Sequence, residues 1–221
     1  MMPPAPSTPT VFVVDDDKLM RDSLESLIQA LGHQVLTFCS AAQFRYYYRS
    51  SMPGCLLLDV HMPRQNGLEL YEQLLEQGIR LPAIFVTAHA DVSTAVAAMK
   101  TGAIEFLEKP FERATLETLL DKALALDTQW RQQEAELDQL DAKIDSLTSR
   151  ERETLQMIID GCSNKLMAAR LDLTERAIEM RRASIMRKLE VESVAELLNV
   201  AVTHRVMNDV RRLRNQNGFA R

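Results

Sequence analysis

The sequence has few of the features that mark secreted or membrane-bound proteins. Its three cysteines, Cys39, Cys55 and Cys162, are an odd number with wide spacing and no metal-ligand pattern. We therefore expect reduced thiols in a cytoplasmic protein. No stretch approaches the ~20 consecutive apolar residues that a membrane-spanning helix needs. The start of the chain, MMPPAPSTPT, has neither a basic region nor an apolar run, which predicts a disordered leader over 1–9 rather than a signal peptide.

The net charge of −5 is too small to indicate a partner, but it conceals an asymmetry. Residues 148–221 contain 14 Lys and Arg against 10 Asp and Glu, a net charge of +4, and the rest of the chain has a net charge of −9. An acidic part followed by a basic part indicates different partners, and the basic end suits nucleic acid. A solvated charged surface would also account for so modest an excess.

The 221 residues suffice for two ordinary domains. In the first half, short apolar runs alternate with amphipathic segments. We expect strands at 10–15, 34–38, 55–59, 82–87 and 104–107, and helices at 17–31, 40–48, 66–77, 91–101 and from 112 onward. This alternation predicts an α/β domain over 10–126, with a doubly wound, five-stranded parallel sheet.

Acidic residues end two of the predicted strands. Asp15 and Asp16 end the run TVFVVDD, and Asp59 ends the run CLLLD. Carboxyl ends of parallel strands meet at one edge of a sheet, so we expect these side chains to share a crevice. Ligands that offer only oxygen favour Mg²⁺. A carboxylate beside Mg²⁺ can attack a phosphoryl group and form an aspartyl phosphate.

A long helix is expected over 112–147, because apolar residues recur there at spacings of 3 and 4 and neither Gly nor Pro interrupts them. This period predicts a coiled-coil linker that forms a dimer. Its expected contact residues are Leu126, Trp130, Leu137, Leu140 and Ile144. The alternative is one amphipathic helix packed on its own domain, which would account for the pattern to about Leu126.

An all-α domain of four short helices is expected over 148–207, with helices at about 149–160, 163–170, 175–188 and 193–206. Thr148 and Glu151 have the spacing of a capping box, so a new helix should begin there. Residues 208–221 are basic, and we expect them to form a frayed tail.

Two sets of motifs resemble a known family. VVDDD, LLLDVHMP, FVTAHAD and EFLEKPF, in this order, resemble the receiver domain of two-component response regulators. LTSRERETLQ, GCSNKLMAARL and IMRKLEVES resemble the LuxR-type helix-turn-helix domain. The combination resembles the FixJ-like branch of the NarL/FixJ family, which implies a flavodoxin-like receiver sheet.

The resemblance implies roles for residues of the first domain. Asp59 would be the phosphoacceptor, and Lys109 would pair with a phosphoryl oxygen, next to a cis peptide bond at Pro110. Mg²⁺ would be held by Asp16, Asp59 and the backbone carbonyl of His61, with Asp15 acting through water. Thr87 and Phe106 would form the conformational switch, and His61 and His89 would flank the site. Asp17 should point away, because adjacent side chains at a strand end face opposite directions.

The resemblance also implies DNA contacts in the second domain, with 175–188 as the recognition helix. The expected contact residues are Lys165, Thr174, Arg176, Glu179, Met180, Arg181, Arg182, Ala183 and Arg187. The sequence departs from the family at three positions: Ala177 stands where Thr is usual, Arg181 where His is usual and Ser184 where Asn is usual. Two acids, Glu175 and Glu179, should also face the DNA.

The function expected from these features is that of a phosphorylation-dependent transcriptional regulator. A histidine kinase would phosphorylate Asp59, and a homodimer would present two recognition helices to double-stranded DNA. The dimer would form through the linker and the face made by the fourth and fifth helices of the receiver. One alternative, a phosphatase of the haloacid-dehalogenase kind, would need an Asp-x-Asp loop after the first strand. Another is a constitutive dimer or scaffold that acts without phosphorylation.

Overall fold

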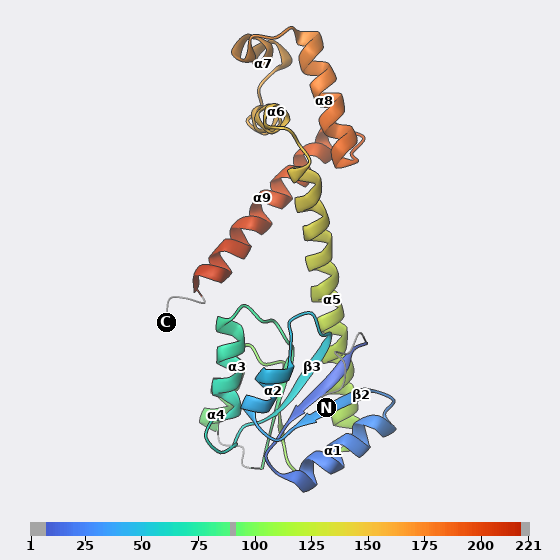
Figure 1. Cartoon of the computed structure of the whole chain (residues 1–221), viewed down its shortest axis with the longest axis vertical. Coiled ribbons are helices and arrows are strands. Elements are labelled where there is room, and N and C mark those ends of the chain that lie inside the picture. The colour runs from blue at the N-terminus through green and yellow to red at the C-terminus, as the bar shows by residue number, and fades with distance from the viewer. Residues whose placement is uncertain (1–7, 89–91, 218–221) are drawn as a thin grey trace. The chain divides into compact units, whose positions relative to one another are not determined.

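The computed structural model describes residues 8–88 and 92–217, and the chain divides into two compact units. The first unit carries the residues up to Arg131, and the second comprises Gln132–Gln216. The boundary falls inside the long helix α5 (Arg113–Asp145), which contributes to both units (Figure 1). Within the described residues, no helix is long and apolar enough to cross a membrane.

The first unit is built on a five-stranded parallel sheet of order β2-β1-β3-β4-β5. The strands are β1 (Thr10–Val14), β2 (Gln34–Phe38), β3 (Gly54–Asp59), β4 (Ala83–Thr87) and β5 (Glu105–Glu108). The predicted α/β fold is confirmed, and each strand lies within one residue of its predicted bounds. The order reverses between β1 and β3, which places a crevice at the carboxyl ends of these two strands.

Helices cover both faces of the sheet, as alternating buried side chains require. The helices of this unit are α1 (Lys18–Ala30), α2 (Ala41–Tyr47), α3 (Gly67–Glu76), α4 (Val92–Lys100) and the first part of α5. Phe12, Leu56 and Phe85 pack on one face with residues of α2 and α3. Val11, Leu57 and Val86 pack on the other face with residues of α1 and α5. The three central strands, β1, β3 and β4, are therefore buried on both sides.

A buried carboxylate fixes α5 to the first unit. Asp127, with 1% of its surface exposed, accepts a hydrogen bond from the backbone amide of Gly54 at 2.8 Å. It also pairs with Arg131 Nε at 2.8 Å, and Arg131 donates to the backbone carbonyls of Ser50 and Met52. One turn of α5 is thus bound to the segment that leads into β3.

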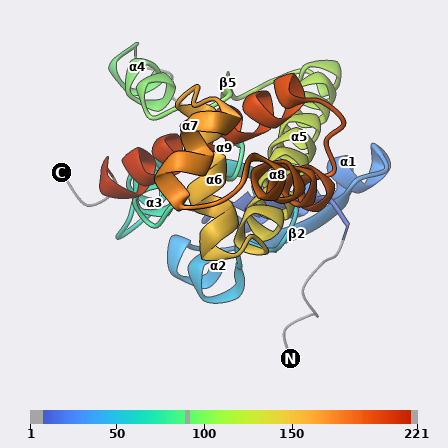
Figure 2. The ribbon, with the colours of Figure 1, turned by 90° about the horizontal axis from the view of Figure 1, so that it is seen from above.

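The second unit contains the end of α5 and four further helices: α6 (Ser149–Ile159), α7 (Asn164–Leu171), α8 (Glu175–Leu189) and α9 (Val194–Asn217). α6 begins with the predicted capping box: the hydroxyl of Thr148 accepts from the amide of Glu151, and the Glu151 carboxylate accepts from the amide of Thr148. Leu155, Met167 and Ile185 belong to one core shared by these helices. α6 and α8 lie side by side in both views of this unit (Figures 1 and 2).

The expectation for the last helix was wrong. We expected it to end near 206 and to be followed by a frayed basic tail over 208–221, but α9 is helical to Asn217, and residues 218–221 lie outside the described residues. Neither Gly nor Pro interrupts residues 194–217, and Arg211 binds three acids of α5. Its guanidinium lies 2.7 Å from Glu134, 3.0 Å from Asp138 and 2.6 Å from Asp141. These ion pairs stabilise the part of the helix that composition alone predicts to fray.

Candidate functional site

A lysine bridges two of the predicted carboxylates at the carboxyl edge of the sheet. Lys109 Nζ lies 2.9 Å from Asp15 Oδ2 and 3.0 Å from Asp59 Oδ1. Val14 pairs with Leu58 in the sheet, so the residues that follow them, Asp15 and Asp59, emerge side by side. Asp15 and Asp59 are 3% and 8% exposed. The fold therefore brings Lys109 into contact with two residues that lie 94 and 50 positions before it in the sequence.

The electrostatics of this cluster reflect its burial. Burial raises the pKa of Asp59, and the negative charge of Asp15 adds to that effect, while hydrogen bonds from Lys109 and from the amide of His61 oppose it. Burial alone would lower the pKa of Lys109, but its hydrogen bonds to Asp15 and Asp59 raise it. The ammonium group is therefore held in its charged form between two carboxylates.

Backbone amides orient the carboxylates. The amide of His61 donates to Asp59 Oδ2 at 2.8 Å, and the amide of Asp17 donates to Asp15 Oδ1 at 2.8 Å. The Asp17 side chain instead caps α1, where it accepts from the amides of Leu19 and Met20. The expectation that Asp17 turns away from the site is confirmed.

Two further residues shape this site, and no motif of the sequence points to them. A Cβ atom on Gly67 would lie 2.2 Å from the carbonyl oxygen of Asp59, so only glycine allows α3 to begin so close to this residue. Arg21, on α1, donates to the carbonyls of Asp15 and Asp16 at 2.7 and 2.9 Å and thereby holds the acidic loop. A glycine at the start of a predicted helix was the only available signal for the first.

The donor set suits Mg²⁺, because carboxylate and carbonyl oxygens are its preferred ligands. Asp16 follows Asp15 at the same strand end and is exposed. In the described parts of the chain, however, no three side chains of the His, Cys, Asp and Glu types converge as a ready-made metal site. The ammonium group of Lys109 lies between Asp15 and Asp59 and neutralises part of their negative charge. Asp15, Asp59 and the nearby exposed Asp16 therefore fit the ion by the chemistry of their oxygen atoms.

The predicted switch residues lie on adjacent strands. Thr87 ends β4, is fully buried, and its carbonyl accepts a hydrogen bond from the amide of Lys109 at 2.8 Å. Phe106, on β5, is half-buried and packs against the core on the α2–α3 side of the sheet. The peptide bond between Lys109 and Pro110 is cis, as the resemblance implies. His61 is exposed, and His89 lies outside the described residues.

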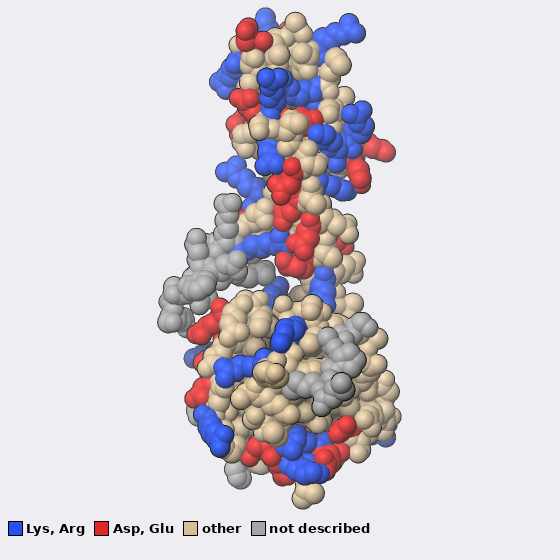
Figure 3. Space-filling view, in the orientation of Figure 1, with Lys and Arg blue, Asp and Glu red and all other residues tan. Residues whose placement is uncertain are grey.

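The predicted recognition helix, α8, has the expected cap and core face. The hydroxyl of Thr174 accepts from the amide of Ala177, while Ile178 and Ile185 are fully buried. Several of the expected DNA-contact residues are exposed: Lys165 on α7, Thr174 before α8, and Arg176, Glu179, Met180, Ala183 and Arg187 on α8. Glu175 is also exposed. Lys and Arg side chains are spread over the visible face of this unit, with acidic ones between them (Figure 3).

Two expected contact residues instead turn into the domain. Arg181 donates to the hydroxyl of Thr154 on α6 at 3.2 Å, and Arg182 donates to Asn164 Oδ1 on α7 at 2.6 Å. Both are half-buried. Ser184 donates to Glu151 Oε1 at 2.8 Å. Two of the three departures from the family pattern, Arg181 and Ser184, are therefore residues that join α8 to α6.

Glu151 is the centre of these contacts. It is 7% exposed and accepts from Lys188 Nζ at 2.7 Å, from Ser184, and from both the amide and the hydroxyl of Thr148. The hydrogen bond from Lys188 and those from Thr148 and Ser184 lower the pKa of Glu151 to about 2. One ionised carboxylate thus caps α6 and binds α8.

The residues predicted to form the dimer contact divide between the two units. Leu126 and Trp130 are half-buried in the first unit, where the guanidinium of Arg80 lies 4.1 Å from the centre of the Trp130 ring. Ile144 packs against the core of the second unit, whereas Leu137 and Leu140 are half-buried outside that core. Leu116, Leu119 and Ala123 belong to the core of the first unit, so packing of α5 within its own unit accounts for the early part of the apolar repeat.

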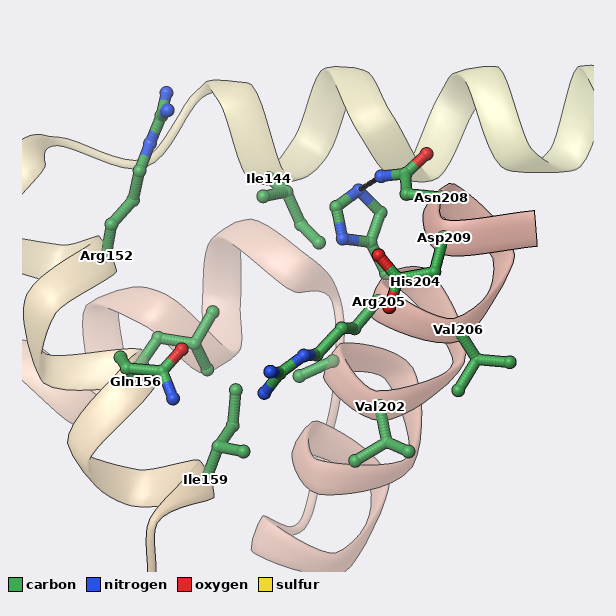
Figure 4. Close-up of a pocket in the computed structure, with 12 residues that line it drawn as sticks. Ile144, Arg152, Gln156, Ile159, Val202, His204, Arg205, Val206, Asn208 and Asp209 are labelled. Carbon is green, nitrogen blue, oxygen red and sulfur yellow. Dashed lines mark hydrogen bonds between the residues drawn. The ribbon is translucent and has the colours of Figure 1, made fainter. Parts of the chain in front are cut away.

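A pocket of about 580 Å³ lies within the second unit, between the end of α5, α6 and α9 (Figure 4). Ile144, Ile159 and Val202 form apolar walls, and the Arg205 side chain extends toward Gln156. None of its lining residues belongs to α7 or α8. The pocket is therefore separate from the residues expected to contact DNA.

Comparison with known proteins agrees with both halves of this description. Residues 11–121 match the model of the response regulator receiver domain, and residues 145–201 match that of bacterial regulatory proteins of the luxR family. FixJ of Bradyrhizobium diazoefficiens is 38% identical over 90% of this chain and 97% of its own length. The response regulator TmoT of Ectopseudomonas mendocina is 36% identical over 91% of this chain and 90% of its own length.

Solved structures show the same similarity. The response regulator StyR is 42% identical and covers 89% of this chain and 100% of its own, with a TM-score of 0.81. Full-length FixJ from B. japonicum is 36% identical and covers 91% of this chain and 99% of its own, with a TM-score of 0.54. The chain belongs to the NarL/FixJ family of two-component response regulators, in its FixJ-like branch, and is a phosphorylation-dependent transcriptional regulator.

Proposed function

We propose that Asp59 is the phosphoacceptor and that a histidine kinase is the donor. The observation that supports this most strongly is the Lys109 bridge: a buried carboxylate at the strand end lies 3.0 Å from an ammonium group that can neutralise an arriving phosphoryl oxygen. As Lys109 and the amide of Asp17 do for Asp15, Lys109 and the amide of His61 orient the two oxygens of Asp59. These two bonds hold the carboxylate in a fixed direction for attack.

In the proposed reaction, a carboxylate oxygen of Asp59 attacks the phosphorus of a phosphohistidine. The new O–P bond forms as the P–N bond breaks, and the electron pair of that bond stays with the imidazole nitrogen. Lys109 leaves its contact with Asp59 to pair with a phosphoryl oxygen. Asp15, Asp16, Asp59 and the carbonyl of His61 would hold Mg²⁺, which neutralises charge on the transferring group when bound. The receiver would catalyse only this transfer and the later hydrolysis of its own acyl phosphate.

The switch that follows would use Thr87 and Phe106. Thr87 ends the strand next to β3, so its hydroxyl could turn toward a phosphoryl oxygen on Asp59. The ring of Phe106, on the neighbouring strand, would then move into the space that Thr87 vacates. A local charge change would thus become a packing change at the β4–β5 side of the sheet.

The output would be a homodimer that reads double-stranded DNA in the cytoplasm. The recognition helix α8 would enter the major groove, and Lys165, Arg176 and Arg187 would supply phosphate contacts. We retain Leu137 and Leu140 as the centre of the proposed linker contact, because Trp130 and Ile144 have partners within their own units. The face formed by α4, β5 and α5 is a second candidate dimer surface.

A phosphorylation experiment tests the assignment of Asp59. The full chain is incubated with Mg²⁺ and a ³²P-labelled phosphoryl donor, and the acid-labile label is measured. We expect Asp59→Asn to carry no label, and the exposed control Asp22→Asn to carry as much as the wild type. Label that persists on Asp59→Asn would contradict the assignment.

A further inference from the structure

We infer that α8 reads a thymine methyl group through Met180 and an adjacent cytosine through Glu179. This inference rests on the proposed DNA-binding function and specifies which bases that site prefers. It follows from which side chains of α8 the domain holds and which it leaves exposed.

Polar contacts fix the rotation of α8 about its own axis. Arg181, Ser184 and Lys188, at positions i, i+3 and i+7, form one side of the helix and bond to Thr154 and Glu151 of α6. These bonds recur over about two turns of the helix, so α8 cannot roll without breaking several of them. The side of the helix that faces away from α6 is therefore set by the structure of the domain itself.

The exposed side follows a separate helical stripe. Arg176, Met180, Ala183 and Arg187 lie at i, i+4, i+7 and i+11, and all four are exposed, with Glu179 beside Met180. Arginines stand at both ends of this stripe, where they can reach phosphates. Its centre consists of a methionine, an alanine and a glutamate. The base-reading part of the helix is therefore apolar and acidic, not basic.

The exposure of Met180 is the decisive observation. Met180 is 68% exposed, although removing its apolar side chain from water would lower the free energy. In the major groove, the one apolar group that base pairs present is the C5 methyl of thymine. Ala183, one turn further along the same stripe, offers a second small apolar surface to the same kind of group. A thymine opposite the centre of α8 would cover both.

Glu179 defines the neighbouring base. A carboxylate only accepts hydrogen bonds, and the amino group of cytosine N4 is the donor that it fits in the major groove. Guanine presents acceptors there, which a carboxylate repels. Two of the four arginines of α8, Arg181 and Arg182, are bound to Thr154 and Asn164, and the exposed Arg176 and Arg187 stand at the two ends of the stripe, away from Glu179 and Met180. The exposed face of α8 therefore favours thymine and cytosine on the strand that it reads.

The test uses the full chain, phosphorylated with acetyl phosphate and Mg²⁺. Bound duplexes are selected from a random pool, and each thymine of the selected half-site is then replaced by uracil, which lacks only the methyl group. We expect one such replacement to weaken binding about fourfold, the effect of one buried methyl group. Met180→Ala should remove most of that sensitivity, whereas Met207→Ala, an exposed methionine on α9, should leave it unchanged.

The cytosine contact is tested by repeating the selection with Glu179→Gln. Because glutamine pairs with adenine in the major groove, we expect the selected base next to the thymine to change from cytosine to adenine. The thymine contact would be overturned if the wild type bound every uracil-substituted duplex as tightly as the original duplex. It would also be overturned if uracil weakened binding by Met180→Ala as much as binding by the wild type. An unchanged selection with Glu179→Gln would overturn the cytosine contact. A pool from which no sequence is enriched would instead overturn the DNA-reading function itself.

Discussion

Lys188 Nζ lies 2.7 Å from Glu151 Oε2, and this ion pair joins the recognition helix to the first helix of its domain. The same carboxylate caps α6 through Thr148. The predicted recognition helix α8 and the helix α6 that begins the domain therefore depend on one ionised group. This arrangement makes the stability of the second unit sensitive to the charge of Glu151.

The first prediction concerns Glu151→Gln. The pKa of Glu151 is about 2 in the folded protein, below its ordinary value of 4.5. Its contribution to the free energy of unfolding is therefore complete above pH 4.5 and is lost as the pH falls toward 2. We expect Glu151→Gln to destabilise the second unit by on the order of 2 kcal/mol at pH 7.

Hydrogen exchange of α6 and α8 amides in the full chain measures this loss. The difference between wild type and Glu151→Gln should shrink as the pH is lowered from 5 to 3, and the exposed control Glu153→Gln should match the wild type. Equal protection in Glu151→Gln at pH 7 would show that the carboxylate does not hold the two helices.

The second prediction concerns Asp127, which binds the amide of Gly54 and the side chain of Arg131. Asp127→Ala leaves a buried amide and a guanidinium without their acceptor. We expect a loss of on the order of 3 kcal/mol in the stability of the first unit. Trp130 is the sole tryptophan of the chain and lies in this unit, so its fluorescence follows the unfolding. Asp121→Asn, at an exposed site on the same helix, serves as the control, and an unchanged midpoint for Asp127→Ala would refute the role of this contact.

The third prediction concerns Gly67→Ala. The added Cβ would lie 2.2 Å from the carbonyl oxygen of Asp59, so the start of α3 or the end of β3 must shift. Because a displacement of about 1 Å can slow a positioned reaction strongly, we expect phosphorylation of Asp59 to slow by at least about tenfold. The rate of label incorporation measures the effect, with Glu72→Ala on the exposed side of α3 as the control. A wild-type rate in Gly67→Ala would mean that this close approach is not needed.

The fourth prediction concerns the linker. Leu137→Asp combined with Leu140→Asp places two charges on the proposed contact and should convert the phosphorylated dimer to a monomer. Sedimentation gives the mass, and the Trp130 fluorescence should show a first unit that remains folded. Gln139→Asp, at an exposed position between the two leucines, should leave the mass unchanged. A dimer that survives the double substitution would locate the interface elsewhere.

The sequence was sufficient where a local pattern carries the structural information. The alternation of apolar runs and amphipathic segments predicted all five strands. The pattern is clearest for β1, β3 and β4, because parallel strands buried on both faces consist of little but apolar residues. Asp15, Asp59 and Lys109 were identified through motifs, and the structure brings all three together. The cap at Thr148 followed from spacing alone.

The sequence was insufficient where a contact joins distant parts of the chain. Asp127 lies between the positions of the apolar repeat and looks like a surface residue, because its partner Gly54 is 73 positions away. The sequence predicts Arg181 and Arg182 as DNA contacts, because their partners Thr154 and Asn164 lie 27 and 18 positions away on other helices. The second half of α9 looked frayed because the acids that bind Arg211 belong to another helix.

DNA retardation by the full chain with and without beryllofluoride and Mg²⁺, on the duplex obtained by selection, shows directly whether the state of Asp59 governs DNA binding. We predict that beryllofluoride tightens binding by at least about tenfold and that Asp59→Asn abolishes this gain. Equal retardation in both conditions, with Asp59→Asn binding as the wild type does, would contradict the proposal that the charge on Asp59 controls the DNA-binding unit.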